Sequence, residues 1–212
     1  MKIAIIGAGN VGRAIAASSL RAGHEVVISS SDEVTARSAA TATGATAALS
    51  NGSAIDGADI VILAVPLGAV DAIATELGAG LDGKTVVDVT NRPTPDLTGA
   101  NPAGTSAAEE IQARIPNAHV VKALNTAFAS RQADPFIDGN QLDGYVAADD
   151  AVAKTSVLEF VGSIGFRPID VGPLSVARTL EAMAWLHISL QMQNGWTWQS
   201  GWKLVGPTDL AA

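Results

Sequence analysis

Short apolar runs of strand length recur along the chain between polar and glycine-rich breaks. They are apolar at nearly every position rather than at alternate positions, which is typical of strands covered on both faces. Stretches with helical periodicity lie between several of them. The expected strands are 2–6, 25–29, 59–65, 85–89, 119–124, 144–148 and 166–171, and the expected helices are 10–22, 32–43, 67–77, 106–115, 150–164 and 175–193.

Strands that alternate with helices predict an α/β fold, here a Rossmann-type doubly wound, mostly parallel sheet with right-handed crossovers. We expect residues 1–171 to form this domain. Residues 172–212 would form a short C-terminal helical extension that completes a substrate cleft or contacts a second subunit. All four tryptophans lie in this extension, where they either pack it onto the sheet or wall a pocket for a flat substrate. Residues 91–105, with three prolines, predict a long loop.

Composition excludes several classes of function. The chain has 212 residues and a formal net charge of −8, and an acidic surface repels phosphate backbones and anionic lipids. We therefore expect neither nucleic acid nor a membrane as a partner. The absence of cysteine excludes disulfides and thiol chemistry and is compatible with a reducing compartment. No apolar run approaches the ~18 residues of a membrane span, so the protein is predicted to be cytoplasmic.

A glycine-rich motif follows the first strand directly and opens the first helix. Its sequence is Gly7-Ala8-Gly9-Asn10-Val11-Gly12, a G-x-G-x-x-G pattern. Gly7 permits a tight turn, Gly9 lets a diphosphate approach the backbone, and Gly12 lets the helix pack closely on the strand. The helix start, with Asn10 and Val11, supplies free amides and a partial positive charge to phosphates. The motif predicts a dinucleotide site, although the glycines could also serve only a tight turn.

The end of the second strand indicates which dinucleotide fits. The run Ser29-Ser30-Ser31-Asp32 stands where an NAD enzyme usually has an acidic residue. Small hydroxyls leave room for a 2′-phosphate and can donate to it, and Arg37 could add a cation, so NADP(H) is favoured. Asp32 opposes this, because a carboxylate repels a 2′-phosphate, and NAD is favoured if it points at the ribose. Ser30 and Glu33 also fit a capping box, which needs no cofactor.

The residues just after the later strands are the next candidates, because ligands of open parallel sheets lie beyond the carboxyl ends of the strands. Val65-Pro66-Leu67 follows the third strand, and its kink can lay apolar surface along a nicotinamide or ribose. Asn91 follows the fourth strand, and Ala123, Asn125 and Thr126 lie at the end of the fifth. Each asparagine can donate to and accept from a carboxamide or a ribose hydroxyl, or can be an ordinary turn residue.

Other chemistries lack support in the sequence. His24 and His119 open strands at the end remote from the cofactor, and His187 lies in the C-terminal helix, where it could reach a pocket but more simply packs. Three scattered histidines do not give the spacing of a metal site, so no metal is expected. There is no G-x-S-x-G motif and no convincing serine, histidine and carboxylate set, so a hydrolase assignment lacks support.

Five groups of residues spread over positions 1–205 form a combined pattern. They are Ile5-Ile6-Gly7-Ala8-Gly9-Asn10-Val11-Gly12, Val87-Asp88-Val89-Thr90-Asn91, Val121-Lys122-Ala123-Leu124-Asn125-Thr126, Asp149-Asp150 with Ala153-Lys154, and Asp170-Val171-Gly172-Pro173-Leu174 with Ala177-Arg178 and Leu180-Glu181. This combination resembles the NADPH-dependent coenzyme F-420 (F420) reductase family. The glycine-rich turn is common to many folds, whereas the Asp-x-Gly-Pro-Leu segment is much more specific.

The resemblance implies a Rossmann domain with a small C-terminal extension, usually a homodimer. Such a protein passes a hydride between NADP(H) and the C5 of an 8-hydroxy-5-deazaflavin, a small-molecule redox co-substrate lying on the nicotinamide beside the C-terminal segment. Both reacting carbons then belong to cofactors, so no catalytic acid or base is nominated. The protein would hold the two rings about 3–3.5 Å apart and exclude water.

The chain also departs from the family pattern. The best characterised members of the family have arginines where this chain has Ser31-Asp32, which weakens the prediction of NADP as the cofactor. They have a histidine where this chain has Asn125, which weakens the prediction of a deazaflavin acceptor. A flavin is then the second candidate acceptor. Arg131, Arg178 and Lys203 could attract the acidic tail of F420, although isolated cations are usually just solvated.

Two other functions stay open. An NAD(P)-dependent dehydrogenase or imine reductase for a small substrate needs a proton donor near the reacting carbon, and Lys122 is the obvious donor at the expected edge. A non-catalytic regulatory module would bind NADPH and show no turnover with any acceptor.

Overall fold

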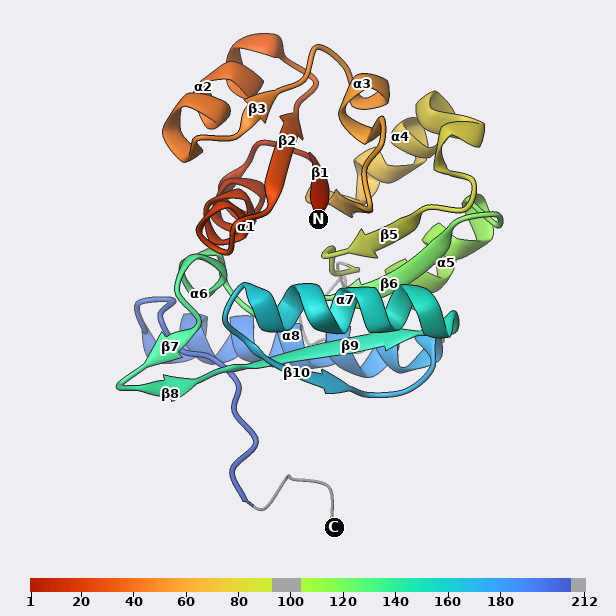
Figure 1. The fold of residues 1–212 in the computed structure, drawn as a ribbon. Helices are drawn as coiled ribbons and strands as arrows, with labels where there is room; N and C mark the ends of the chain where they lie inside the picture. Colours follow the sequence, from red (N-terminus) through yellow and green to blue (C-terminus); the bar gives the residue numbers. More distant parts are fainter. Residues whose placement is uncertain (93–103, 207–212) are drawn as a thin grey trace.

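One eight-stranded sheet organises the part of the chain that the structure describes, residues 1–92 and 104–206 (Figure 1). In this computed structural model the strands are β1 (Lys2–Ile6), β2 (Glu25–Ser29), β3 (Thr46–Ala47), β4 (Ile60–Leu63), β5 (Thr85–Asp88), β6 (His119–Ala123), β9 (Asp143–Ala148) and β10 (Arg167–Asp170). They lie in the order β10-β9-β6-β5-β4-β1-β2-β3. Two further strands, β7 (Phe136–Ile137) and β8 (Asn140–Gln141), form a separate antiparallel pair.

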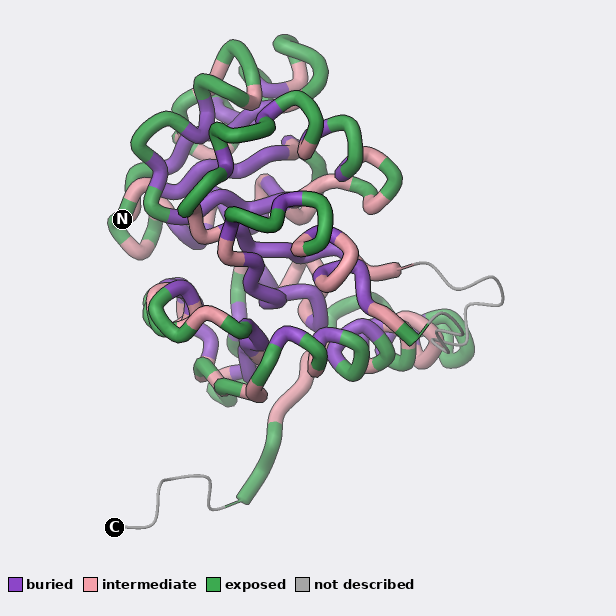
Figure 2. Tube along the Cα trace, turned by 90° about the vertical axis from the view of Figure 1, so that its right-hand side faces the viewer, coloured by how far each residue is buried: buried purple, intermediate pink, exposed green. Residues whose placement is uncertain are grey.

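Helices connect the strands and cover both faces of the sheet. They are α1 (Asn10–Arg21), α2 (Glu33–Thr43), α3 (Asn51–Ile55), α4 (Val70–Leu77), α5 (Ala107–Arg114), α6 (Ala129–Ala133), α7 (Ala151–Ser163) and α8 (Ala177–Asn194), with 3-10 turns at Leu67–Ala69, Gly78–Leu81 and Leu174–Val176. One core layer packs the strands against α1, α2 and α7, and the other packs them against α3, α4, α5 and the start of α8. The central strands are accordingly buried along most of their length, while the edge strands β3 and β10 and the outer helix faces are partly exposed (Figure 2).

Local sequence signals set the ends of the longer helices. Asp32 and Asp150 cap α2 and α7 by accepting from backbone amides, and Ser106 and Glu109 form a capping box at α5. Gly44 ends α2 in a left-handed conformation, with φ of 88°. These caps leave the apolar stripe of each helix facing the sheet.

The strand register brings the carboxyl ends of five strands to one edge. Ile6 of β1 pairs with Ser29 of β2 and with Leu63 of β4. Leu63 pairs in turn with Asp88 of β5, and Asp88 with Lys122 of β6. All these pairs are parallel, so the residues that follow β2, β1, β4, β5 and β6 lie side by side along one rim. This rim carries the candidate site.

The expected α/β fold is confirmed, with bounds within a few residues for the long elements. Sequence reasoning missed the short elements β3, α3, α6, β7 and β8, and it did not identify β9 as antiparallel to β6. Most of the expected loop at 91–105 lies outside the described residues. Within the described ranges, none of the helices combines the length and apolar character needed to cross a bilayer.

Candidate functional site

The turn between β1 and α1 has the geometry that its glycines require. Gly7 has a φ of 114°, and a Cβ there would lie 2.2 Å from the Ala64 carbonyl oxygen. A Cβ at Gly12 would lie 2.0 Å from the Gly7 carbonyl oxygen, so the helix packs on the turn only without a side chain. At Gly9 a Cβ would meet no protein atom within 4 Å. Gly9 is therefore the point where the backbone faces open space.

The start of α1 is free to bind an anion. Gly9 precedes the helix and supplies no side-chain cap, and the first turn contains no acidic residue. The first amides of a helix have no partner within it and carry the positive end of its dipole. Asn10 is exposed at the first helical position. These features match the expected phosphate-binding turn.

A pocket of about 690 Å³ extends from this turn along the sheet rim. That volume lies in the range of small-molecule and cofactor sites. Its lining residues are Ile6, Gly7, Ala8, Gly9, Ser30, Ser31, Leu49, Ser50, Asn51, Ala64, Val65, Pro66, Ala69, Ala72, Ile73 and Glu76. The expected Ser30, Ser31, Val65 and Pro66 are among them, while Leu67 begins the 3-10 turn after Pro66 and is outside the lining.

Asn51 and Glu76, which sequence reasoning missed, line the far end of this larger pocket. Ser29 is buried, and its Oγ donates to Asn51 Oδ1 at 2.7 Å. Asn51 Nδ2 donates to Glu76 Oε2 at 2.8 Å. Ser29 thus holds α3 in place rather than facing the pocket. The capping box of Ser50 and Ser53 was the available sequence signal for α3.

The two charged residues expected near the ribose both have partners within or at the start of α2. Arg37 donates to Glu33 Oε1 through Nε at 2.9 Å and through Nη2 at 2.5 Å, and it does not line the larger pocket. Asp32 is the cap of α2, with its oxygens accepting from the amides of Val34 and Thr35. The alternative capping box on Ser30 is therefore wrong, because Asp32 occupies that role.

A second, smaller pocket of about 160 Å³ lies where the rim meets α8. It is lined by Val11, Val89, Asn91, Leu124, Asn125, Thr126, Ala127, Phe128, Ala129, Gln132, Ala184 and Ile188. The structure thus brings together four residues expected from three separate segments: Val11, Asn91, Asn125 and Thr126. Ala123 is buried in β6 behind them and outside the lining. Ala184 and Ile188 show that the C-terminal helix contributes to this second pocket.

The two asparagines of the second pocket bind each other. Asn125 Nδ2 donates to Asn91 Oδ1 at 2.9 Å and to the Leu180 carbonyl at 3.0 Å, and Asn91 Nδ2 donates to the Asn125 carbonyl at 3.3 Å. Asn125 is only 7% exposed, and its Oδ1 has no hydrogen-bond partner among the described residues. A buried acceptor without a partner costs free energy, so a ligand donor in the pocket would restore it.

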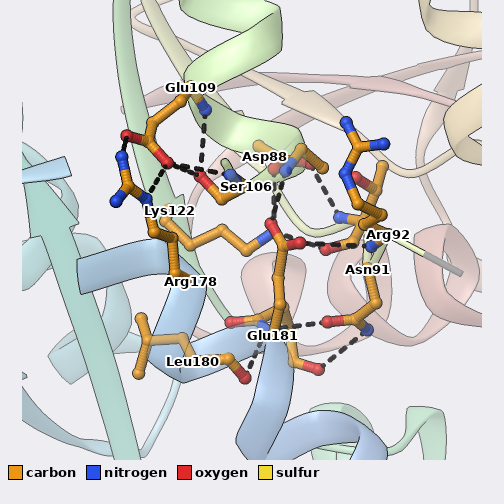
Figure 3. A network of polar contacts seen from close by, with 12 residues as sticks. Asp88, Asn91, Arg92, Ser106, Glu109, Lys122, Arg178, Leu180 and Glu181 are labelled. Atoms are coloured by element: carbon orange, nitrogen blue, oxygen red, sulfur yellow. Dashed lines mark hydrogen bonds and ion pairs between the residues drawn. The ribbon is translucent and has the colours of Figure 1, made fainter. Parts of the chain in front are cut away.

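Lys122 lies behind this pair in a fully buried ionic cluster (Figure 3). Its Nζ donates to Asp88 Oδ2 at 2.8 Å, to Glu181 Oε1 at 2.9 Å and to the Thr90 carbonyl. Three acceptors use all three ammonium protons, and Lys122 lines neither pocket. The expectation that Lys122 is available as a proton donor is therefore wrong. Instead, it ties β5 and β6 to α8.

The remaining candidates have structural surroundings. His187 is buried, with Nδ1 3.3 Å from the Thr126 carbonyl and Nε2 2.7 Å from Ser200 Oγ, and burial lowers the pKa of its imidazole. Arg178 is bound to Glu109, Arg131 Nη1 donates to the Phe136 carbonyl at 2.8 Å, and Lys203 Nζ donates to the Gln141 carbonyl at 2.8 Å. Each of these three cations has its own partner.

The four tryptophans of the extension lie outside the linings of both pockets, and Trp196 is exposed. Trp198 contacts Phe128 edge-on, with ring centroids 5.1 Å apart, and Trp185 Nε1 donates to the Arg92 carbonyl at 2.6 Å. Phe128 is itself part of the second pocket, so Trp198 supports that wall from behind. Within the described residues, no group of histidines and carboxylates has metal-binding geometry.

Comparison with known proteins relates this site to a family. Residues 2–92 match the family described as NADP oxidoreductase, coenzyme F420-dependent. Over 217 aligned positions the chain is 32% identical to the F420-dependent NADP reductase of Methanothermobacter marburgensis, covering 92% of this chain and 94% of that protein. The chain belongs to the F420-dependent NADP oxidoreductase family.

Two further similarities agree with this family assignment. A crystal structure of a candidate F420-dependent NADP reductase from Arthrobacter sp. FB24 has a TM-score of 0.85 at 31% identity, covering 97% of this chain and 100% of that one. Metalloreductase STEAP3 of Rattus norvegicus is 30% identical over 183 residues, which is 86% of this chain and 36% of STEAP3. The chain therefore spans about a third of the length of STEAP3. The resemblance predicted from the sequence is confirmed, and the family is one of NADP-dependent oxidoreductases.

Proposed function

We propose that this protein is an NADP(H)-linked oxidoreductase that transfers a hydride to a planar redox acceptor, with F420 as the first candidate and a flavin as the second. The observation that carries the proposal is the pair of pockets on one rim. The larger pocket begins at the open backbone of Gly9, and the second contains the unpartnered Asn125 oxygen. Val11, the fifth residue of the glycine-rich motif, lines the second pocket.

The chain's residues fit a dinucleotide along this rim. The open space at Gly9 and the free amides of α1 suit the diphosphate. Ser30, Ser31 and the α3 residues suit the adenosine half, and Val65 and Pro66 offer apolar surface between the two ends. When bound, the dinucleotide supplies the hydride, and the protein orients it and keeps water away.

The nicotinamide end belongs in the second pocket. A carboxamide carries two N–H donors and one acceptor, and the Asn125 oxygen lacks a donor there. The Asn91 and Leu180 contacts fix the Asn125 side chain, so its oxygen is already oriented before a ligand arrives. Such preorganisation serves a reaction whose main requirement is the alignment of two rings.

A planar acceptor accounts for the chemistry better than a small imine or ketone. Reduction of a small substrate usually needs a positioned proton donor, and the ammonium protons of Lys122 are all held by other groups. Hydride transfer between two cofactor rings needs no such donor. The relatives whose names specify F420 make the deazaflavin the first acceptor to test.

We further propose that the protein acts as a cytoplasmic homodimer in which residues 172–212 complete the acceptor cleft. α8 already contributes Ala184 and Ile188 to the second pocket. Leu186 and Met192 of the same helix, with Trp196 after it, are exposed and offer apolar surface to a second copy. Sedimentation equilibrium should give twice the chain mass, and a monomer would contradict the homodimer.

The proposed reaction is tested by rapid mixing of the protein and NADPH with F420, FMN or a small imine. We expect fast reduction of F420 or FMN and none of the imine. Gly9→Asp is the control, because a carboxylate at the open turn should abolish dinucleotide binding in a folded protein. Reduction of the imine alone would favour the small-substrate enzyme, and bound NADPH without turnover would favour a regulatory module.

A further inference from the structure

The ribose end of the larger pocket lacks positive charge. Ser30 and Ser31 are its neutral members after β2, and Glu76 is the charged residue among those that line the pocket. Arg13, which follows the glycine turn, and Arg37 of α2 both have partners: Arg13 Nε donates to the Ala8 carbonyl at 2.9 Å, and Arg37 is paired with Glu33. A 2′-phosphate carries nearly two negative charges at neutral pH and normally needs such cations.

The anion position at the start of α2 is already filled by the chain itself. Asp32 Oδ1 accepts from the Val34 amide at 3.2 Å, and Oδ2 accepts from the Thr35 amide at 2.9 Å and from the Thr35 hydroxyl. The Thr35 hydroxyl, followed by the two amides, lowers the pKa of the Asp32 carboxyl, so it stays ionised at neutral pH. A helix start that would attract a phosphate therefore presents a carboxylate.

We propose that this pocket gains no affinity from a 2′-phosphate, so that the protein accepts NADH as well as NADPH, and that Asp32 sets this selectivity. The inference rests on the proposed dinucleotide site and departs from the NADP dependence of the family. Asp32 directly follows Ser31, which lines the pocket, and repulsion between its charge and a nearby phosphate offsets what the serine hydroxyls donate. The 2′-hydroxyl of NADH carries no charge, so Asp32 does not repel it in this way.

The test compares dissociation constants for NADH and NADPH by calorimetry, with the same full-length protein at two salt concentrations. We expect NADH to bind as tightly as NADPH or more tightly. Asp32→Asn keeps a good capping residue and removes the charge, so it should tighten NADPH binding about threefold to tenfold and leave NADH unchanged. Higher salt should shrink this difference because it screens exposed charges.

Asp150→Asn is the matched control, because Asp150 caps α7 in the same way by accepting from the Ala153 amide at 2.8 Å. It should leave both affinities unchanged. Native protein that binds NADPH more than about tenfold tighter than NADH, or an Asp32→Asn variant with an unaltered ratio, overturns the inference while the dinucleotide site stands. Binding of neither nucleotide overturns both.

Discussion

At the scale of single residues, Gly9 and Gly12 lie three positions apart in one turn yet differ in what a methyl group would meet. Gly9→Ala should keep its stability, because its Cβ faces open space, but should lose dinucleotide affinity at least about tenfold, since the diphosphate needs that space. Gly12→Ala should unfold more easily by about 1–3 kcal/mol, because its Cβ would overlap the Gly7 carbonyl. Urea denaturation and NADPH titration of both variants check this. Native NADPH affinity in Gly9→Ala would contradict it.

Lys122 places a buried charge in the core, between two buried carboxylates. Lys122→Met would leave the carboxylates of Asp88 and Glu181 buried without their ammonium partner, and we expect a loss of about 3–5 kcal/mol in the free energy of unfolding. Arg178→Met, which breaks the half-exposed pair with Glu109, should cost about 1 kcal/mol or less. Similar losses for the two variants in urea denaturation would contradict the assigned role of the buried cluster.

At the scale of elements, the ion pair between α5 and α8 makes stability depend on pH. The Arg178 guanidinium, together with Ser106, lowers the pKa of Glu109 from 4.5 to about 2. A lowered carboxyl pKa stabilises the fold above the ordinary value, and that stability is lost as the pH falls from 4.5 towards 2. Glu109→Gln should therefore be less stable than the native protein at pH 7 and approach it in stability near pH 2. If denaturation experiments give the same difference in free energy of unfolding between the two proteins at pH 7 and near pH 2, the ion pair between Glu109 and Arg178 does not have this role.

The long elements could be predicted because the central strands are buried on both faces and each long helix buries one stripe of side chains. β4 is apolar at every position, which is typical of a strand in a sheet covered on both faces. The five-residue α3 and the two-residue β3 carry too few residues for a periodic signal, and nothing local specifies that β9 runs antiparallel to β6. The sequence pattern favoured Ser30 as the cap of α2, but Asp32 also has a suitable side chain, and its contacts with the amides two and three residues further on make it the cap.

The site was predictable to the extent that it follows the strand ends. The glycine turn, Asn91 and Asn125 were found because parallel strands end on one rim. Asn51 and Glu76 reach the larger pocket through the packing of α3 against α4, which leaves no trace in the local sequence. Lys122 was misjudged for the same reason: its place at the end of β6 is as expected, but α8 covers it with Glu181.

At the scale of the whole molecule, two covering layers leave one rim open, and α8 from the C-terminal part of the chain closes one end of that rim. The larger pocket and the second pocket are thereby fixed by elements far apart in sequence. In the proposed function, the larger pocket and the second pocket together would hold the two flat ring systems. It also explains why a buried ionic cluster is kept behind the second pocket: it fastens α8 to the strands that carry Asn91 and Asn125.

The most direct measurement is a crystal structure of the protein soaked with NADP⁺. We expect the diphosphate to lie against Gly9 and the first amides of α1, and the nicotinamide to enter the second pocket with its carboxamide donating to Asn125 Oδ1. Density for the nucleotide away from the glycine turn, or a nicotinamide outside the second pocket, would contradict the account.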